Sequence, residues 1–172
     1  MAMKNQQRQS GFRGYLLPLS IIGCSEDFVC LFTQNQIVEI LEPRFLPEIP
    51  GSPGYLKGVL LYRDSLLPVI DLDELCARHS SLWRKDYRQL VVVRTGATDP
   101  ETGAPLKAVV AAEERMRIAR ISGQELTEAF EQLEVPSVLS KTGLVRGCFK
   151  HENDSIALLD LGPLARGAYA SI

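Results

Sequence analysis

The feature that most constrains this chain is an internal repeat of a strand–turn–strand unit. Residues 57–75 read KGVLLYRDSLLPVIDLDEL, and residues 146–164, 89 positions later, read RGCFKHENDSIALLDLGPL. Both copies run from a basic residue and glycine through two apolar strands, joined by a polar turn, to Asp-Leu. Four of the 19 aligned residues are identical, and the spacing from glycine to aspartate is 13 residues in both. The repeat predicts two similar β modules packed as one body, which favours a surface-presenting scaffold over an enzyme with one catalytic cleft.

Further apolar runs of strand length surround the two copies, and they indicate a chain dominated by short strands. Pro18 lies inside the first run, which therefore reads as an edge strand or a bulged one. Ile37, Ile40 and Leu41 recur at helical spacing and predict one or two helical turns over residues 35–41. We expect strands at Tyr15–Ile22, Phe28–Thr33, Leu56–Tyr62, Leu66–Ile70, Leu90–Thr95 and Lys107–Ala112. Short strands with frequent turns point to small barrels.

Turns and caps support this interpretation. Asp64 and its counterpart Asn153 lie in the two hairpin turns, and both residue types tolerate left-handed backbone. Asp71 and Asp160 follow the second strand of each copy and read as helix caps rather than as catalytic acids. A capping box at Ser122 predicts an amphipathic helix over residues 123–134.

Composition excludes several classes of function. The chain has 172 residues, 45% hydrophobic and 23% charged, with a net charge of −2. This charge gives no electrostatic footprint for nucleic acid or for an anionic membrane. No apolar run approaches the roughly 20 residues that a membrane span needs. The first residues lack the apolar core of a secretory signal, so residues 1–13 are expected to form a polar tail.

Cysteine and histidine offer little chemistry. The four cysteines, Cys24, Cys30, Cys76 and Cys148, form no C-x-x-C pair, and they read as buried free thiols of a cytosolic protein. A Cys24–Cys30 bridge across a hairpin remains the alternative. The only histidines are His79 and His151, so a zinc site has no evident ligand set. A thiol hydrolase that pairs one cysteine with either histidine is the competing enzymatic hypothesis, and a barrel that binds a small ligand is a third class. No cofactor is expected.

The side chains best suited to contacts lie at the first hairpin and just upstream of it. Tyr62 and Arg63 adjoin the turn, and these residue types are enriched at interface hot spots. Glu39 lies among Ile37, Val38 and Ile40, beside an apolar surface. A solvated turn arginine and a solvated surface carboxylate are the alternatives for these positions.

The segment from Ile49 to Leu75 resembles the signature of the CheW family, the coupling proteins of bacterial chemosensory arrays. Upstream, residues 37–40 (IVEI) resemble the family's V-x-E-I/V, and downstream Gly147 and residues 157–161 (ALLDL) match its second lobe. Two positions depart from the pattern, because Leu61 replaces an asparagine and Asp64 replaces a glycine. The matching residues in the signature are Pro50, Pro53, Tyr55, Leu56, Gly58, Val59, Arg63, Leu66, Pro68, Val69, Ile70, Asp71 and Leu72.

The resemblance implies a mainly β fold of two five-stranded, SH3-like β-barrels around a shared hydrophobic core, with short helices. Residues 14–168 would form this single CheW-like domain of two intertwined lobes, and residues 169–172 a C-terminal tail. Gly58, Asp71, Gly147 and Asp160 would be structural residues at equivalent places in the lobes. No catalysis is implied.

The resemblance also implies partners and a location. The family links the cytoplasmic tips of methyl-accepting chemoreceptors to the regulatory domain of a CheA-type histidine kinase. Receptor helices dock between the lobes, and the kinase domain meets the barrel ends through apolar contacts. On this basis we expect Ile37, Glu39, Ile40, Tyr62 and Arg63 to face the receptor. The expected location is the cytoplasm, at membrane-bound receptor arrays; Leu61 and Asp64 suggest a divergent system such as one controlling type IV pili.

Overall fold

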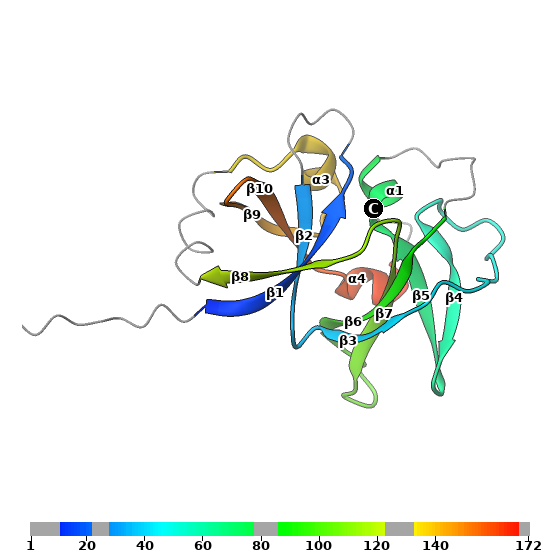
Figure 1. Ribbon diagram of the computed structural model, residues 1–172. Helices are drawn as coiled ribbons and strands as arrows, with labels where there is room; N and C mark the ends of the chain where they lie inside the picture. The colour runs from blue at the N-terminus through cyan, green and yellow to red at the C-terminus, as the bar shows by residue number, and fades with distance from the viewer. Residues whose placement is uncertain (1–10, 22–27, 78–85, 123–132, 169–172) are drawn as a thin grey trace, which may run out of the picture.

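The computed structural model describes residues 11–21, 28–77, 86–122 and 133–168, and these residues form ten strands and short helices (Figure 1). The mainly β fold expected from the sequence is confirmed. The elements are β1 (Gly11–Leu19), β2 (Phe28–Thr33), β3 (Ile37–Leu41), β4 (Leu56–Tyr62), β5 (Ser65–Asp71), α1 (Leu72–Ala77), β6 (Gln89–Thr98), β7 (Pro105–Ala112), β8 (Arg117–Ser122), α3 (Ser137–Lys141), β9 (Val145–His151), β10 (Asp154–Leu159) and α4 (Gly162–Ala165).

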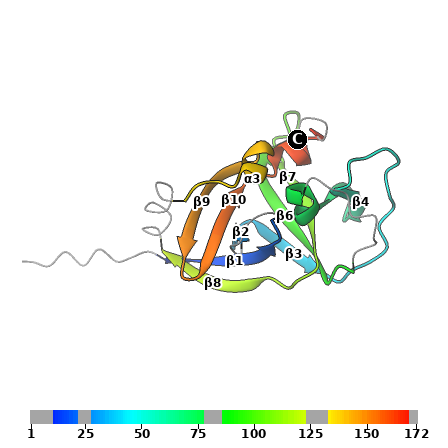
Figure 2. The same ribbon diagram turned by 90° about the horizontal axis from the view of Figure 1, so that it is seen from above.

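Two five-stranded sheets divide the molecule into two lobes. Lobe 1 has the strand order β8-β1-β2-β10-β9, and lobe 2 has the order β3-β6-β7-β5-β4. Each sheet contains one parallel pair, β2 with β10 in lobe 1 and β5 with β7 in lobe 2. The chain leaves lobe 1 after β2, builds all of lobe 2, and returns with β8. The lobes are therefore intertwined, and they lie side by side with α4 between them (Figures 1 and 2).

The two copies of the repeat form equivalent hairpins, one in each lobe, as the sequence predicts. Gly58 lies opposite Val69 in one hairpin, and Gly147 lies opposite Leu158 in the other. Each hairpin has a register shift next to its glycine, where one residue of the first strand bulges out of the ladder. This bulge, which the two hairpins share, is stronger evidence for a structural repeat than the few identical residues of the two copies are.

The hairpin turns correct one prediction. The left-handed residue is Arg63 (φ 52°) in lobe 2 and Glu152 (φ 54°) in lobe 1, each the first residue of its turn. Asp64 and Asn153, which were expected to take this conformation, follow one residue later. The two turns still match, because Arg63 and Glu152 occupy the same position of the repeat.

Three clusters of buried apolar side chains stabilise this arrangement. One cluster draws only on lobe 2, around Val69 and Val92, and another draws only on lobe 1, around Leu16 and Phe149. The largest cluster joins strands of both lobes to α1, α3 and α4. It includes Leu17 from lobe 1 and Val91 from lobe 2. This shared core fixes the lobes against each other.

Two local predictions near the N-terminus are wrong. Residues 37–41 form strand β3, paired with β6, and not helical turns. The register shifts between Ile37 and Glu39, which breaks the alternation of side chains and imitates helical spacing. Strand β1 is neither an edge strand nor bulged, since it lies between β8 and β2 and pairs with β2 without a register shift. Its pairing with β8 ends at Leu16, so Pro18 interrupts no ladder on that side.

Other predictions fall partly or wholly outside the described residues. The helix predicted over residues 123–134 is one of them, because residues 123–132 are not among the described residues. The expected tail of residues 1–13 is described only from Gly11, which begins β1, so residues 11–13 belong to the lobe 1 sheet. Cys24 and His79 lie outside the described residues as well.

Candidate functional site

Three of the five predicted contact residues lie together in lobe 2, where the edge strands β3 and β4 are bridged by side chains. We call this place the mouth of lobe 2. The Tyr62 hydroxyl donates a hydrogen bond to Glu39 Oε2 at 2.6 Å. Arg63 Nη2 lies 3.8 Å from the same oxygen, and Arg63 Cζ lies 5.1 Å from the centre of the Tyr62 ring. The Arg63 side chain is 75% exposed and that of Glu39 44%. The result is a solvent-facing cluster with a fixed carboxylate and a freer guanidinium.

This cluster also closes the barrel of lobe 2. Glu39 belongs to β3 and Tyr62 to β4, which are the two edge strands of the lobe 2 sheet. The hydrogen bond between them therefore bridges the two edges, while the Tyr62 ring is buried in the lobe 2 core. Hydrogen bonding to the Glu39 carboxylate raises the pKa of Tyr62, so the hydroxyl keeps its proton as donor. Tyr62 thus orients the carboxylate of Glu39.

Ile37 and Ile40 lie on the other face of β3. Glu39 pairs with Val92 of the lobe 2 core, whereas Ile40 pairs with Val91 of the shared core. Cross-strand partners project from the same face of a sheet, so Ile40 points toward the face where the lobes meet. Ile37 packs at the border of the shared core, and Ile40 remains 48% exposed. One short strand therefore presents a polar group to the barrel mouth and an apolar group to the junction of the lobes.

Lobe 1 contains residues equivalent to Glu39 and Ile40 that could not be recognised from the sequence. The repeat makes Val69 equivalent to Leu158, and both ladders can be followed from these residues to the edge strands β3 and β8. In lobe 2, cross-strand partners lead from Val69 through Val109 and Val92 to Glu39. In lobe 1, once the β2–β10 pairing is continued by one residue, they lead from Leu158 through Leu31 and Leu16 to Arg117. Ile118 then corresponds to Ile40, and it is 61% exposed. Residues 37–41 and 117–122 share no motif, so only the structure reveals the match.

The polar contact at the mouth of lobe 1 has reversed charge. Arg117 forms an ion pair with Asp154 of β10. Asp154 lies opposite His151, which occupies the position that Tyr62 holds in lobe 2. Both mouths are therefore bridged by a charged side chain from the edge strand, acidic in lobe 2 and basic in lobe 1.

The outer faces of the two hairpins differ more sharply. Leu61 and Leu66 lie opposite each other in lobe 2 and are 66% and 68% exposed. The equivalent residues of lobe 1 are Lys150, which is exposed, and Ser155, which is buried, and Lys150 Nζ lies 3.1 Å from Ser155 Oγ. Leu61, the departure from the family's asparagine, thus adds to an exposed apolar patch beside Arg63. Patches of this kind are typical of protein interfaces.

Gly58 occupies a position that no other residue type fits. Its φ is +139°, and a Cβ atom there would lie 2.2 Å from the carbonyl oxygen of Pro47. The loop after β3 therefore crosses β4 at the glycine and continues into the signature segment. Gly147 is outside the positive-φ region, so its lobe 1 position imposes no such backbone requirement.

Asp71 caps helix α1, as predicted, through the backbone N–H of Glu74. The same prediction is wrong for Asp160, because the N-cap of α4 is Leu161 and no side chain caps that helix. Asp71 is 1% exposed; its Oδ1 accepts a hydrogen bond from the Glu74 backbone N–H at 3.0 Å, and its Oδ2 accepts one from the Tyr87 hydroxyl at 2.9 Å. Asp160 Oδ1 accepts from the Gly162 backbone N–H at 2.8 Å, and its Oδ2 pairs with Arg146. Burial alone would raise the pKa of Asp160, but hydrogen bonds from Arg146 and from Gly162 hold it below its ordinary value. Both carboxylates are engaged in local structure.

The described cysteines are poor nucleophiles. Cys30, Cys76 and Cys148 are free and buried. Burial raises the pKa of all three thiols, to about 12 for Cys76 and about 11 for Cys148. A thiolate, not a thiol, is the reactive species. The free Cys30 also leaves no bridge to Cys24.

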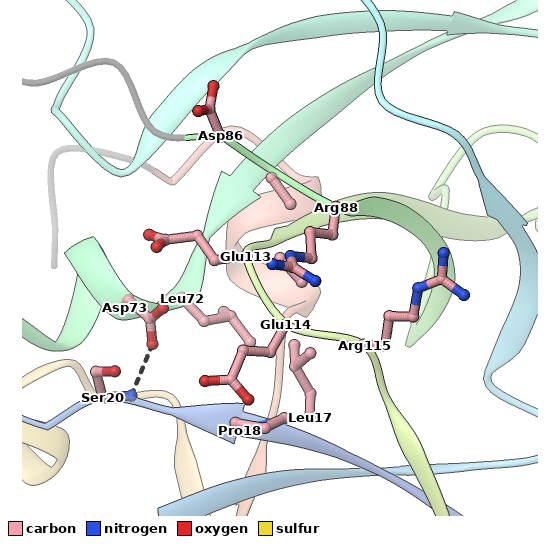
Figure 3. Close-up of a pocket in the computed structure, with 12 residues that line it drawn as sticks. Leu17, Pro18, Ser20, Leu72, Asp73, Asp86, Arg88, Glu113, Glu114 and Arg115 are labelled. Atoms are coloured by element: carbon pink, nitrogen blue, oxygen red, sulfur yellow. Dashed lines mark hydrogen bonds between the residues drawn. The ribbon is translucent and has the colours of Figure 1, made fainter.

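A pocket of about 670 Å³ opens where the two lobes meet near α1 (Figure 3). Its floor includes the buried Leu17 and Leu72, and its rim carries charged side chains of both signs, among them Arg88, Glu113 and Glu114. The Ser20 backbone N–H donates to Asp73 Oδ1 at 2.7 Å along one side. The pocket is thus an open, charged depression rather than an apolar cavity inside a barrel.

Within the part of the chain that the structure describes, no three His, Cys, Asp or Glu side chains are grouped as a metal site. The helices described there are also too short and polar to cross a membrane.

Comparison with known proteins decides the family. The family model described as CheW-like domain matches residues 25–168, most of the chain. The chain belongs to the CheW-like family. Among solved structures, it is similar to the scaffolding protein TtCheW from Thermoanaerobacter tengcongensis, with a TM-score of 0.63 and 17% identity over 95% of this chain and 93% of that one. At that identity the likeness supports the shared fold. No curated protein matches the chain.

Proposed function

We propose that this CheW-like protein is a non-catalytic adaptor that couples methyl-accepting chemoreceptors to a CheA-type histidine kinase in the cytoplasm, at receptor arrays. The observation that carries the proposal is the Glu39–Tyr62–Arg63 cluster, in which Tyr62 brings together the motif residues Glu39 and Arg63 on an exposed surface. The name of the similar structure describes that protein as a scaffold, in agreement with such a role.

The proposal assigns receptor contact to the β3 strand and the adjoining hairpin turn. Ile37 and Ile40 supply apolar area, and Glu39 and Arg63 supply charge-assisted hydrogen bonds that fix the orientation of the receptor. Tyr62 holds the Glu39 carboxylate in place at 2.6 Å. The exposed Leu61 and Leu66 give the kinase domain an apolar surface on the outer face of the same hairpin.

A binding experiment tests the adaptor role directly. The full chain is titrated calorimetrically with a soluble chemoreceptor signalling fragment, with the regulatory domain of the kinase, and with each partner after saturation by the other. An adaptor binds both partners at once, so saturation with one leaves binding of the other intact. Mutual exclusion, or binding of neither, contradicts the proposal.

The absence of catalysis is tested with the same protein. The buried thiols, with raised pKa values, favour an inert interior. A thiol hydrolase would release product from a p-nitrophenyl ester in a burst equal to the enzyme concentration. We expect no burst, and a burst that disappears in Cys76→Ser or Cys148→Ser would support the enzyme instead.

A further inference from the structure

Two arginines lie directly opposite each other on the edge of lobe 1. Arg13 of β1 pairs in register with Arg120 of β8, and both side chains are exposed. The stem of Arg120 lies over Gly11, where an added Cβ would be 3.2 Å from its Cγ. Cross-strand partners share a face at about 5 Å between Cβ atoms, and like charges there are destabilising. The fold therefore accepts an unfavourable contact at this place.

The positive charge of this pair is not neutralised within the described part of the molecule. No hydrogen bond or ion pair joins Arg13 or Arg120 to another described side chain. Other arginines of the same lobe do find carboxylates, since Arg117 pairs with Asp154 and Arg146 with Asp160. An arginine is charged at every physiological pH, so the pair presents about two positive charges on a chain whose net charge is −2.

The pair adjoins apolar surface on the same face of the sheet. Tyr15 lies two residues from Arg13 and packs at the border of the shared core, and Ile118 pairs with Tyr15 and is 61% exposed. Residues on the opposite face, such as Leu16 and Ile121, fill the core of lobe 1. The exposed edge thus presents an isoleucine beside two guanidinium groups.

We infer that Arg13 and Arg120 form a carboxylate-recognition site for an acidic helix of the partner that binds between the lobes. The inference rests on the proposed function, in which that partner is the chemoreceptor hairpin. A helix with an apolar residue on Ile118 and a Glu or Asp one turn away would place its carboxylate between the two guanidinium groups. Planar guanidinium forks bind carboxylates bidentately, and the carboxylate removes the repulsion that the free protein retains.

The decisive variant is Arg120→Glu, which replaces the repulsive pair with a cross-strand Arg–Glu pair. A merely structural arginine would lower stability when replaced, whereas this site predicts the opposite. We expect the melting temperature to stay level or rise, and the affinity for the receptor fragment to fall about tenfold or more, as for a lost charge-assisted contact. Arg13→Gln and Arg120→Gln should each weaken binding by about three- to tenfold and reduce its dependence on salt. Lys141→Glu, a reversal at an exposed residue of α3, is the control and should bind as wild type does.

Each outcome has a defined meaning. Wild-type affinity in Arg120→Glu overturns the carboxylate site while leaving the adaptor role standing. Failure of the wild-type chain to bind any receptor fragment defeats the adaptor role first. If the three arginine variants keep receptor binding but lose sedimentation with vesicles containing phosphatidylserine, the pair serves a lipid surface and the inference is wrong. A lower melting temperature in Arg120→Glu and in Arg120→Gln would make the residue structural and overturn it as well.

Discussion

The two lobes share one backbone plan but differ in what they expose. Both hairpins have the same register, a bulge at the same position and a left-handed residue at the same turn position. At equivalent positions of the hairpins, however, lobe 2 exposes Leu61 and Leu66, whereas lobe 1 exposes Lys150 and buries Ser155 beside it. Strand pairing is thus common to the lobes, whereas side-chain chemistry and the backbone angle at the first-strand glycine distinguish them. A two-lobed adaptor can in this way present different surfaces from one repeated unit.

The basic residues at the two bulges also differ between the lobes, in how deeply their ion pairs are buried. Lys57 and Arg146 occupy the equivalent bulge positions, and both pair with a carboxylate beyond the second strand. In lobe 2 the carboxylate is Glu74, 2.5 Å from Lys57 Nζ and only 2% exposed. In lobe 1 it is Asp160, whose side chain is 25% exposed and whose partner Arg146 is 63% exposed. The ion pair of the bulge cation is therefore buried in one lobe and more open in the other, which predicts unequal costs of removing it.

The largest expected difference between the lobes concerns their glycines. Gly58→Ala forces a Cβ into the Pro47 carbonyl at a backbone angle that only glycine adopts readily. Strain and overpacking together should cost about 4 kcal/mol of unfolding free energy. Gly147→Ala, the matched variant in lobe 1, carries no strain from positive φ and should cost distinctly less. Urea unfolding of both variants measures the difference, and equal losses would show that the lobes do not differ here.

The second difference concerns the two bulge cations. Lys57→Met leaves the Glu74 carboxylate buried without its cation, and Glu74 Oε2 already has no hydrogen-bond partner among the described residues. Breaking a buried pair from one side should cost about 3 kcal/mol. Arg146→Met opens a solvent-exposed pair and should cost at most about 1 kcal/mol. Thermal unfolding of the two variants provides the comparison, and a larger loss in lobe 1 would contradict it.

The third comparison sets the two hairpin turns against each other in binding. Arg63→Ala removes an exposed side chain next to Glu39 and should leave folding intact. If Arg63 contacts the receptor, its loss should weaken receptor binding by on the order of 1–2 kcal/mol and leave kinase-domain binding nearly unchanged. Glu152→Ala, at the same turn position of lobe 1, is the control. Titration calorimetry measures both affinities. If Arg63→Ala binds the receptor as tightly as wild type does, the arginine is only a solvated turn residue. If the variant binds the kinase domain more weakly instead, the two surfaces were assigned in reverse.

Much of this plan could be predicted from the sequence, because each hairpin is encoded locally. The alternation of apolar residues and the spacing from Gly58 to Asp71 were enough to place both hairpins. The prediction failed at β3, where the bulge after Ile37 changes which face each side chain takes. A bulge depends on pairing with β6, which the residues of β3 alone do not reveal.

The candidate site was predictable only in part, for the same reason. Its residues were found by their resemblance to a known motif, but the contact of Tyr62 with Glu39 arises only when distant edge strands close the barrel. Arg117 and Ile118 could not be matched to Glu39 and Ile40 from the sequence, because β3 and β8 occupy equivalent places in the two sheets but have no common motif. The opposition of Arg13 and Arg120 likewise depends on a pairing between strands far apart in the chain.

The smallest expected effect is a difference in acid sensitivity at the end of the lobe 1 repeat. The pKa of Asp160 is lower in the folded protein than in the unfolded chain. Its ion pair with Arg146 therefore stabilises the fold above the unfolded pKa of 3.8, and this contribution is lost as pH falls through the lower, folded value. Asp160→Asn removes that dependence while keeping a side-chain acceptor for the Gly162 N–H. Because the pair is solvent-screened, wild type should exceed the variant by less than about 1 kcal/mol at pH 6, with the gap closing below pH 3.8. Unfolding curves at a series of pH values measure the gap, and one that stays constant or widens toward low pH would show that Asp160 acts through its shape and not its charge.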